Sequence, residues 1–132
     1  MTNILIVEDD QSAMLYEQVM IRNVADTHGV RITVDAAIDG VKAVAMCRES
    51  AYDVVLLDMM LPIIDGIQAA RAMRTFGKSK TAVIIGCSAR EDDPLYVAKA
   101  LKAGVDFFAK KPLSKESIER FLGVVPGAAV DE

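Results

Sequence analysis

The side chains best suited to chemistry stand directly after short apolar runs, at four separate places in the sequence. An acidic triplet follows the first run, one aspartate ends the second, a serine follows the third and a lysine pair follows the last: Glu8, Asp9 and Asp10, then Asp58, Ser88, and Lys110 with Lys111. Short runs of β-branched and aliphatic residues are typical of strands buried on both faces. Because the carboxyl ends of parallel strands meet at one edge of a sheet, we expect these side chains to converge there.

Carboxylates gathered in one place repel each other unless one is protonated or a cation lies among them. Two like charges about 4 Å apart raise the energy by about 4 kcal/mol at an effective dielectric constant of about 20. Each residue alone also has a structural explanation, and Asp10 in particular suits the N-cap of a helix. Oxygen ligands without histidine or cysteine favour Mg²⁺, which keeps waters that a phosphate oxygen can replace. With Lys111 as a further positive charge, the residues predict a site that holds a phosphoryl group beside Asp58.

Strand-like and helix-like segments alternate along the chain and would position these residues. Strands are predicted over residues 3–7, 31–35, 53–57, 81–87 and 106–109. Helices are predicted over residues 11–27, 40–50, 66–76, 94–103 and 115–122, with Asp39, Asp65 and Ser114 as N-caps and Gly29 and Gly104 as stop signals. This alternation favours an α/β fold, a five-stranded parallel sheet in the flavodoxin-like order 2-1-3-4-5 with five helices on both faces.

Length and composition fit one domain and argue against several classes of partner. The 132 residues suffice for one hydrophobic core, and we expect a domain over residues 1–122 and a flexible tail or linker start over residues 123–132. The net charge of −4 offers no basic face for direct nucleic-acid binding, and no apolar run could cross a membrane. The N-terminus shows no signal peptide, which predicts a cytoplasmic protein. Cys47 and Cys87 lack metal-ligand spacing and are expected to be buried free thiols.

The candidate residues form four motifs in a defined order. These motifs are the acidic pair Glu8-Asp9, the segment Asp58-x-x-x-Pro62-x-x-Asp65-Gly66, Ser88 with its small neighbour Ala89, and Lys111-Pro112. In this order and spacing they resemble the receiver domain of the two-component response regulator family, over residues 3 to about 122. Similar members are the chemotaxis response regulator and the receivers of hybrid histidine kinases.

The resemblance implies a role for each acidic residue of the predicted site. Asp58 would be the phosphoacceptor. Mg²⁺ would be held by Glu8, Asp9, Asp58 and the main-chain carbonyl of Met60, with Asp9 as a direct ligand. The phosphoryl donor would be the phosphohistidine of a histidine kinase or a histidine phosphotransfer protein. The chain would then act in phosphorelay signal transduction, as an acceptor that assists its own phosphorylation and slow autodephosphorylation rather than as an enzyme.

The resemblance also implies how phosphorylation is sensed. Ser88 and Lys111 would bind phosphoryl oxygens, and the Lys111–Pro112 bond is typically cis in this family. The movement of Ser88 would let an aromatic residue on the last strand rotate inward, a position occupied here by Phe108. Many members carry tyrosine there, so we expect only the packing part of this switch to operate.

Two surfaces are predicted to contact partners. On the first helix, the apolar residues expected to face the core are Leu15, Tyr16, Val19, Met20 and Val24. The other apolar residues, Met14, Ile21 and Ala25, are expected to form an exposed strip that suits docking of a helical phosphotransfer protein. On the fourth helix, Tyr96, Lys99 and Ala103 are expected to share a face near Phe108. Met60 and Arg90 would flank the approach of water to the phosphoryl group.

Three other readings are weighed against this one. A metal-dependent phosphohydrolase typically has a second aspartate where this chain has Met60, and a flavodoxin would have a Ser/Thr/Gly-rich loop where it has Glu8–Asp10. A non-phosphorylated pseudo-receiver that only binds partners would usually lack one of the site residues. The sequence leaves open whether the chain is a stand-alone regulator, a piece of a hybrid kinase or part of a longer regulator.

Overall fold

Strands and helices alternate throughout the computed structural model, which describes residues 1–88 and 93–124. The strands are β1 (Thr2–Val7), β2 (Ile32–Ala37), β3 (Val54–Asp58), β4 (Val83–Ser88) and β5 (Phe107–Lys110). The helices are α1 (Gln11–His28), α2 (Gly40–Glu49), α3 (Gly66–Thr75), α4 (Pro94–Ala103) and α5 (Lys115–Leu122). All paired strands are parallel, and their order is β2-β1-β3-β4-β5, which confirms the predicted fold.

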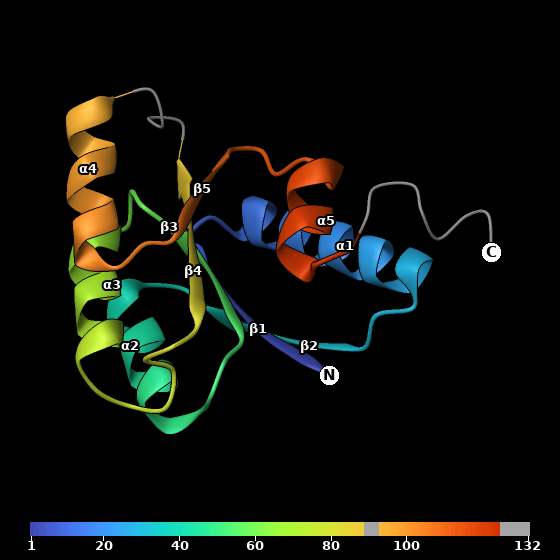
Figure 1. The fold of residues 1–132 in the computed structure, drawn as a ribbon, viewed down its shortest axis with the longest axis horizontal. Coiled ribbons are helices and arrows are strands. Elements are labelled where there is room, and N and C mark those ends of the chain that lie inside the picture. Colours follow the sequence, from blue (N-terminus) through green and yellow to red (C-terminus); the bar gives the residue numbers. More distant parts are fainter. Residues whose placement is uncertain (89–92, 125–132) are drawn as a thin grey trace.

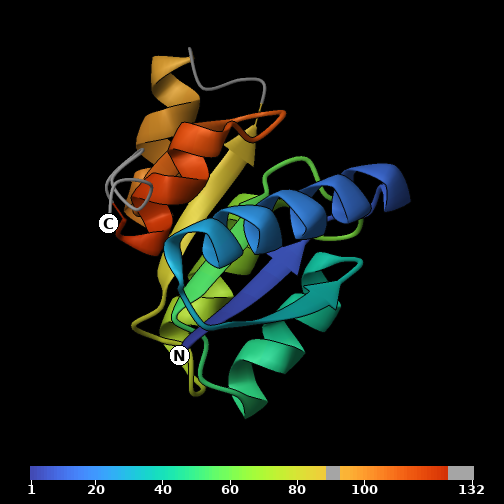
Figure 2. The ribbon, with the colours of Figure 1, turned by 90° about the vertical axis from the view of Figure 1, so that its right-hand side faces the viewer.

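The sheet is the central layer, and helices cover both of its faces. Figures 1 and 2 show α1 and α5 on one face and α2, α3 and α4 on the other. Each face has its own apolar cluster, one built around Leu5, Val55 and Met73 and the other around Ile6, Leu56 and Ile118. Every residue of β3 is buried, so this strand lies at the centre of the molecule. No helix in the described residues is long and apolar enough to span a membrane.

Helix ends follow the capping chemistry expected from the sequence. Each described helix has an acidic or hydroxyl N-cap whose side chain accepts a hydrogen bond from a main-chain N–H of the first turn, namely Asp10, Asp39, Asp65, Asp93 and Ser114. Gly29 and Gly104 end α1 and α4 in the left-handed conformation, as predicted. The two cysteines are free and buried, as predicted, and they lie in the apolar clusters on opposite sides of the sheet.

The strands extend further at their carboxyl ends than the sequence pattern predicted, apart from β1. Asp58 pairs with Cys87 and Ser88 pairs with Lys110, so these polar residues belong to the strands and do not merely follow them. A polar side chain at the end of a buried strand interrupts the apolar pattern, but its main chain can still join the ladder. The chemistry-bearing side chains are therefore held by the sheet itself.

The inward stripe predicted for α1 is wrong in its first half. Leu15, Tyr16 and Val19 are 62%, 42% and 48% exposed, although Val24 is buried as expected. The inward face is instead centred on Glu17, which is only 4% exposed. A charged residue on the buried face shifts the apparent apolar stripe around the helix, because the remaining apolar residues then suggest a different face.

The strip of α1 predicted to be exposed for a partner is correspondingly buried. Ile21 is fully buried and Ala25 is 1% exposed, while Met14 is partly buried against the cluster shared with α5. On α4, Ala103 is also buried, so the predicted face there is not exposed along its length, although Tyr96 does contact the Phe108 ring. The predictions that concern Ala89, Arg90 and all of the tail but its first two residues fall outside the described residues.

Candidate functional site

The predicted site residues come together at the carboxyl edge of the sheet. Glu8 directly follows β1, Asp58 ends β3, Ser88 ends β4 and Lys111 directly follows β5. The strand order reverses between β1 and β3, the place where ligands bind in open α/β sheets. Residues from four separate parts of the chain thus share one edge, as the sequence predicted.

An acidic cluster forms the centre of this edge. Carboxylate oxygens of Glu8, Asp9 and Asp58 all lie within 4.8 Å of one another. Glu8 and Asp58 are 2% and 5% exposed, whereas Asp9 is exposed to solvent. Asp10 is the N-cap of α1 and donates its main-chain N–H to Glu8 Oε2 at 3.2 Å, so it orients Glu8 rather than joining the cluster.

Lys111 links two of these carboxylates. Its Nζ donates to Glu8 Oε1 at 2.8 Å and lies 3.4 Å from Asp58 Oδ2. The Lys111–Pro112 peptide bond is cis, as the resemblance implied. The hydroxyl of Tyr16 donates to the carbonyl of Leu113, the residue after Pro112, so α1 also contacts the turn that follows β5. The ammonium of Lys111 thus contacts two of the three carboxylates in the acidic cluster, which leaves the cluster with an excess of negative charge.

Burial and charge shift the proton affinities of this cluster. Burial raises the pKa of the Glu8 carboxyl, the hydrogen bond from Lys111 opposes that rise and the charge of Asp58 adds to it. Burial disfavours the ammonium of Lys111, but its hydrogen bond to Glu8 and the charge of Asp58 outweigh burial and raise its pKa. The cluster thus attracts positive charge and holds the ammonium of Lys111 firmly.

The loop after β3 presents Asp58 in a fixed orientation. Asp58 Oδ1 accepts a hydrogen bond from the main-chain N–H of Met60 at 3.0 Å. Asp65 caps α3 in a reciprocal capping box, and Gly66 packs so closely that a Cβ would lie 2.7 Å from the Cα of Met59. Ile63 adopts φ 72°, a left-handed conformation that β-branched residues rarely take. The Asp65-Gly66 pair is therefore needed to close the loop under Asp58.

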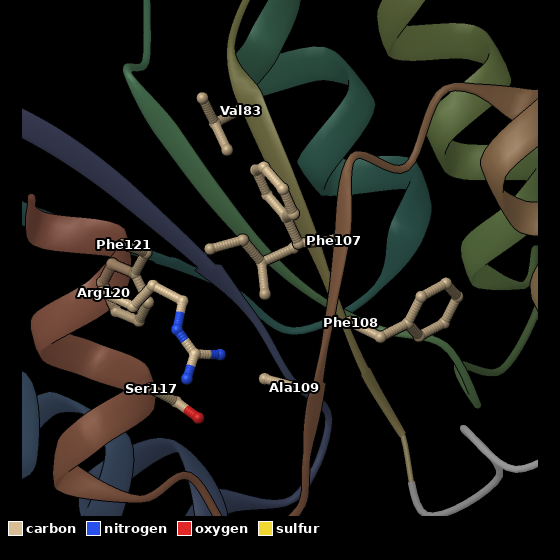
Figure 3. A pocket seen from close by; sticks show the side chains of 8 residues that line it. Val83, Phe107, Phe108, Ala109, Ser117, Arg120 and Phe121 are labelled. Atoms are coloured by element: carbon tan, nitrogen blue, oxygen red, sulfur yellow. The ribbon is translucent and has the colours of Figure 1, made fainter.

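Ser88 and Phe108, the residues predicted to sense phosphorylation, lie on the neighbouring strands β4 and β5. Ser88 is 1% exposed at the end of β4, beside β5. Phe108 pairs with Gly86, where an added Cβ would approach the ring to 3.2 Å, and its ring meets that of Tyr96 edge-on at 6.5 Å between centroids. Figure 3 shows the ring of Phe108 on the opposite side of β5 from Phe107. Phe108 thus faces α4, and its space depends on the glycine in β4.

A separate pocket of about 360 Å³ lies between β5 and α5, on the Phe107 side of the strand (Figure 3). Its lining is mostly apolar and includes Phe107, which is 62% exposed, and Phe121, with Arg120 and Ser117 as polar groups. None of the acidic cluster lines it. This pocket is distinct from the candidate site at the sheet edge.

The acidic cluster suits a hard divalent cation. It offers carboxylate oxygens from Glu8, Asp9 and Asp58, and no histidine or cysteine belongs to this group within the described residues. One member is exposed, so a cation could be reached from solvent and keep water ligands, as Mg²⁺ prefers. The donor chemistry therefore fits the predicted magnesium.

Two residues of the site region were missed in the sequence. Glu17, on the inner face of α1, lies in the electric field of Glu8, Lys111 and Asp58. Its signal in the sequence was a charge that interrupts the apolar pattern of a helix. The left-handed Ile63 gave no signal, because a β-branched residue is expected to avoid positive φ.

Comparison with known sequences decides the family. The sequence model of the response regulator receiver domain matches residues 4–122. The chain belongs to this family. The receiver domain is 34% identical to the two-component response regulator ORR41 of Oryza sativa subsp. japonica over 120 residues, which cover 89% of each chain. It is also 34% identical to the chemotaxis protein CheY of Halobacterium salinarum over 84 residues, 64% of this chain and 68% of that protein.

Solved structures show the same fold. The receiver domain of the sensor histidine kinase PA1611 from Pseudomonas aeruginosa, which has a magnesium ion coordinated in its active-site cleft, is 28% identical, with a TM-score of 0.75 over 92% of this chain and 98% of that one. The chemotaxis protein CheY4 of Vibrio cholerae shares the fold at 21% identity and a TM-score of 0.81, over 93% and 97% of the two chains. Receiver domains are phosphoacceptor signalling domains, and this one functions in phosphorelay signal transduction.

Proposed function

We propose that Asp58 is the phosphoacceptor of this receiver domain and that a phosphohistidine on a histidine kinase or phosphotransfer protein is the donor. The observation that supports this most is the position of Asp58 at the end of the central strand, 3.4 Å from the ammonium of Lys111 and among the carboxylates of the acidic cluster. A carboxylate oxygen of Asp58 attacks phosphorus, the bond from phosphorus to the imidazole nitrogen breaks, and the imidazole leaves.

The surrounding residues prepare Asp58 for this attack. The main-chain N–H of Met60 donates a hydrogen bond to Oδ1 of Asp58, and the ammonium of Lys111 donates to Oδ2 of the same carboxylate. Lys111 and Ser88 are placed to bind phosphoryl oxygens, so that charge is stabilised as it develops in the transition state. Glu8, Asp9, Asp58 and the main-chain carbonyl of Met60 would hold Mg²⁺, which supplies positive charge to the phosphoryl oxygens when bound.

The product is an aspartyl phosphate that the domain loses slowly to water. We propose that Ser88 moves toward the phosphoryl group and that Phe108 then rotates inward from its contact with Tyr96. This movement would change the surface formed by β5 and α4. Met60 is 58% exposed, which fits its predicted place beside the water path. Because its apolar side chain does not help to orient water, we expect a longer-lived phosphoryl group than a polar residue at this position would give.

The donor would contact α1 through a different strip from the one predicted. Leu15 and Val19 are exposed on the helix that begins directly after the acidic residues, and Ile63 is 78% exposed in the loop after Asp58. Exposed apolar side chains beside a reactive carboxylate suit the face of a helical phosphotransfer protein. A cytoplasmic location stays a prediction from the sequence.

Intact-mass measurement with a small phosphodonor tests the proposed acceptor. With acetyl phosphate and Mg²⁺, the wild-type chain should gain one phosphoryl group, and Asp58→Asn should gain none. Asp26→Asn changes an exposed aspartate on α1 and serves as the matched control, which should be labelled like wild type. Labelling of Asp58→Asn at the wild-type level would contradict the assignment, and turnover of many donor molecules per chain would favour a phosphohydrolase.

A further inference from the structure

Tyr16 is a residue of α1 that reaches across to the turn carrying Lys111. Its hydroxyl donates to the carbonyl of Leu113 at 3.1 Å, a contact between residues 97 positions apart in the sequence. The side chain is on a helix surface and 42% exposed, so burial alone does not hold it in place. The proposed phosphoacceptor chemistry gives this hydrogen bond no role, although its acceptor is two residues from the lysine whose ammonium donates to Asp58.

The turn that follows β5 needs contacts from elsewhere in the molecule to fix its orientation. Pro112 has no main-chain N–H, so it cannot anchor the turn by donating a hydrogen bond. The side chain of Leu113 is 1% exposed and packs in the apolar cluster on the face of the sheet that α1 and α5 cover. This packing holds the turn against the core, whereas the hydrogen bond from Tyr16 holds the carbonyl of the same residue in one direction.

Lys111 depends on the orientation of this turn because burial does not hold its side chain. The side chain is 28% exposed, and a lysine ammonium is a strongly hydrated charge on a flexible four-carbon chain. Its Nζ nevertheless lies 2.8 Å from Glu8 Oε1 and 3.4 Å from Asp58 Oδ2. A small rotation of the main chain in residues 111–113 would lengthen one of these contacts, since both depend on where the lysine side chain begins.

The first turns of α1 also hold the other partner of this ammonium. Asp10, the N-cap of α1, donates its main-chain N–H to Glu8 Oε2 at 3.2 Å. Tyr16 follows six residues later, about 9 Å along the helix. Less than two turns of one helix therefore contact both Glu8 and the turn of Lys111. The ion pair between Lys111 and Glu8 completes a closed set of contacts.

We propose that Tyr16 is a positioning residue, whose hydroxyl holds the turn of Lys111 against α1 so that the ammonium stays between Glu8 and Asp58. This inference rests on the proposed function, because its consequence is faster phosphorylation of Asp58. Misplacement of a reacting group by about 1 Å can slow a reaction by about 100-fold. Tyr16→Phe removes only the hydroxyl and leaves Leu113 buried, so it should slow labelling of Asp58 by a smaller factor, about tenfold.

Initial rates of labelling by acetyl phosphate at saturating Mg²⁺ test this role in two backgrounds. The donor is a small molecule, so the rates do not depend on docking of a partner protein on α1. Tyr16→Phe should slow labelling of chains that carry Lys111 and should have no further effect in chains that carry Lys111→Met. Tyr52→Phe removes a hydroxyl that donates to Asp35, and its ring packs in the apolar cluster on the other face of the sheet. This control should match wild type.

The NMR signal of the Lys111 ammonium gives a second readout, which needs no phosphodonor. Protons in hydrogen bonds exchange with water only when those bonds open. In proton–nitrogen spectra of the unphosphorylated chain, the ammonium protons should therefore exchange faster in Tyr16→Phe than in wild type and Tyr52→Phe. The loss of the signal in Lys111→Met assigns it to this lysine.

The possible outcomes separate this inference from the proposed function. Faster exchange in Tyr16→Phe, with slower labelling that is confined to chains carrying Lys111, would support the role of Tyr16. Unchanged exchange, equal labelling rates, or the same slowing in both backgrounds would overturn that role and leave Asp58 as the acceptor. Failure of wild type to be labelled would overturn the proposed function and with it the inferred effect of Tyr16 on phosphorylation.

Discussion

At the scale of single residues, the site is a balance between crowded negative charge and one ammonium. Lys111 Nζ binds Glu8 at 2.8 Å and also lies near Asp58, so it compensates two buried carboxylates at once. Without that ammonium, each carboxylate would lose its nearest positive charge within the described residues. Lys111 should therefore matter more for reactivity than for the fold, since it is at the rim and partly exposed.

Replacing Lys111 by methionine should slow phosphorylation of Asp58 by about 100-fold, because loss of one preorganised charge at a transition state has costs of that order. The initial rate of labelling by acetyl phosphate at saturating Mg²⁺ measures this effect. Lys110→Met changes the exposed neighbour and should leave the rate near that of wild type. Similar rates in both variants would mean that Lys111 does not act on the phosphoryl group.

Glu17 should make the free energy of unfolding depend on pH. Its pKa is raised to about 7 in the fold from an ordinary value of 4.5, so between these values the folded chain binds more protons than the unfolded chain. Stability must then fall as pH rises through this window. In Mg²⁺-free urea denaturation, the advantage of Glu17→Met over wild type should grow by about 2 to 3 kcal/mol between about pH 5 and about pH 8. A constant difference would contradict the raised pKa.

At the scale of elements, α1 shows why the buried face of a helix can be predicted wrongly from its sequence. The helix was recognised from its cap and its glycine stop, but its buried face was assigned by hydrophobicity alone. Because Glu17 lies in the middle of that face, the pattern favoured Leu15 and Val19, which are exposed. The ends of β4 and β5 were underestimated for a similar reason, since Ser88 and Lys110 are polar but still pair in the sheet.

Arg74 joins three elements at the other end of the sheet. Its guanidinium donates to the carbonyls of Lys80, Ala82 and Gly104 and binds the carboxylate of Asp106, so it connects α3 to the segments that precede β4 and β5. Its side chain is 23% exposed. The contacts hold backbone carbonyls that would otherwise lack these donors, which makes Arg74 a structural residue.

Arg74→Met should lower the free energy of unfolding by about 2 to 3 kcal/mol, because hydrogen bonds from a charged donor to partly buried carbonyls are lost. Urea denaturation measures the change. Arg71→Met, which alters an exposed arginine on the same helix, should change stability by less than about 0.5 kcal/mol. Equal effects of the two substitutions would show that the connection made by Arg74 contributes little.

At the scale of the whole molecule, the fold and the candidate site were largely predictable because both follow from strand alternation. Five strand–helix units with right-handed crossovers lead to one sheet order, and that order brings the ends of β1, β3, β4 and β5 to one edge. What could not be predicted depends on packing between distant segments. The burial of Glu17 on the inner face of α1 depends on such contacts and shows in the sequence only as a charge that interrupts an apolar pattern, whereas the left-handed conformation of Ile63 leaves no local signal.

The exposed apolar residues of α1, Leu15 and Val19, should distinguish protein phosphodonors from small-molecule phosphodonors. Leu15→Ala removes an apolar side chain that is 62% exposed, so stability should be nearly unchanged. Phosphotransfer from a phosphohistidine protein that labels wild type should slow by about tenfold if Leu15 is a contact, while labelling by acetyl phosphate stays the same. Val41→Ala, on the opposite face of the sheet, is the control. Equal loss with both donors would place the effect in the site and not in docking.

The most direct test of the account is to locate the phosphoryl group on the chain. After reaction with acetyl phosphate and Mg²⁺, borohydride reduction converts an aspartyl phosphate to homoserine, and peptide mass spectrometry then identifies its position. The account predicts homoserine at position 58 alone, with none formed when Mg²⁺ is chelated. Homoserine at position 9, 10 or 65 in place of 58, or labelling that is independent of Mg²⁺, would contradict it.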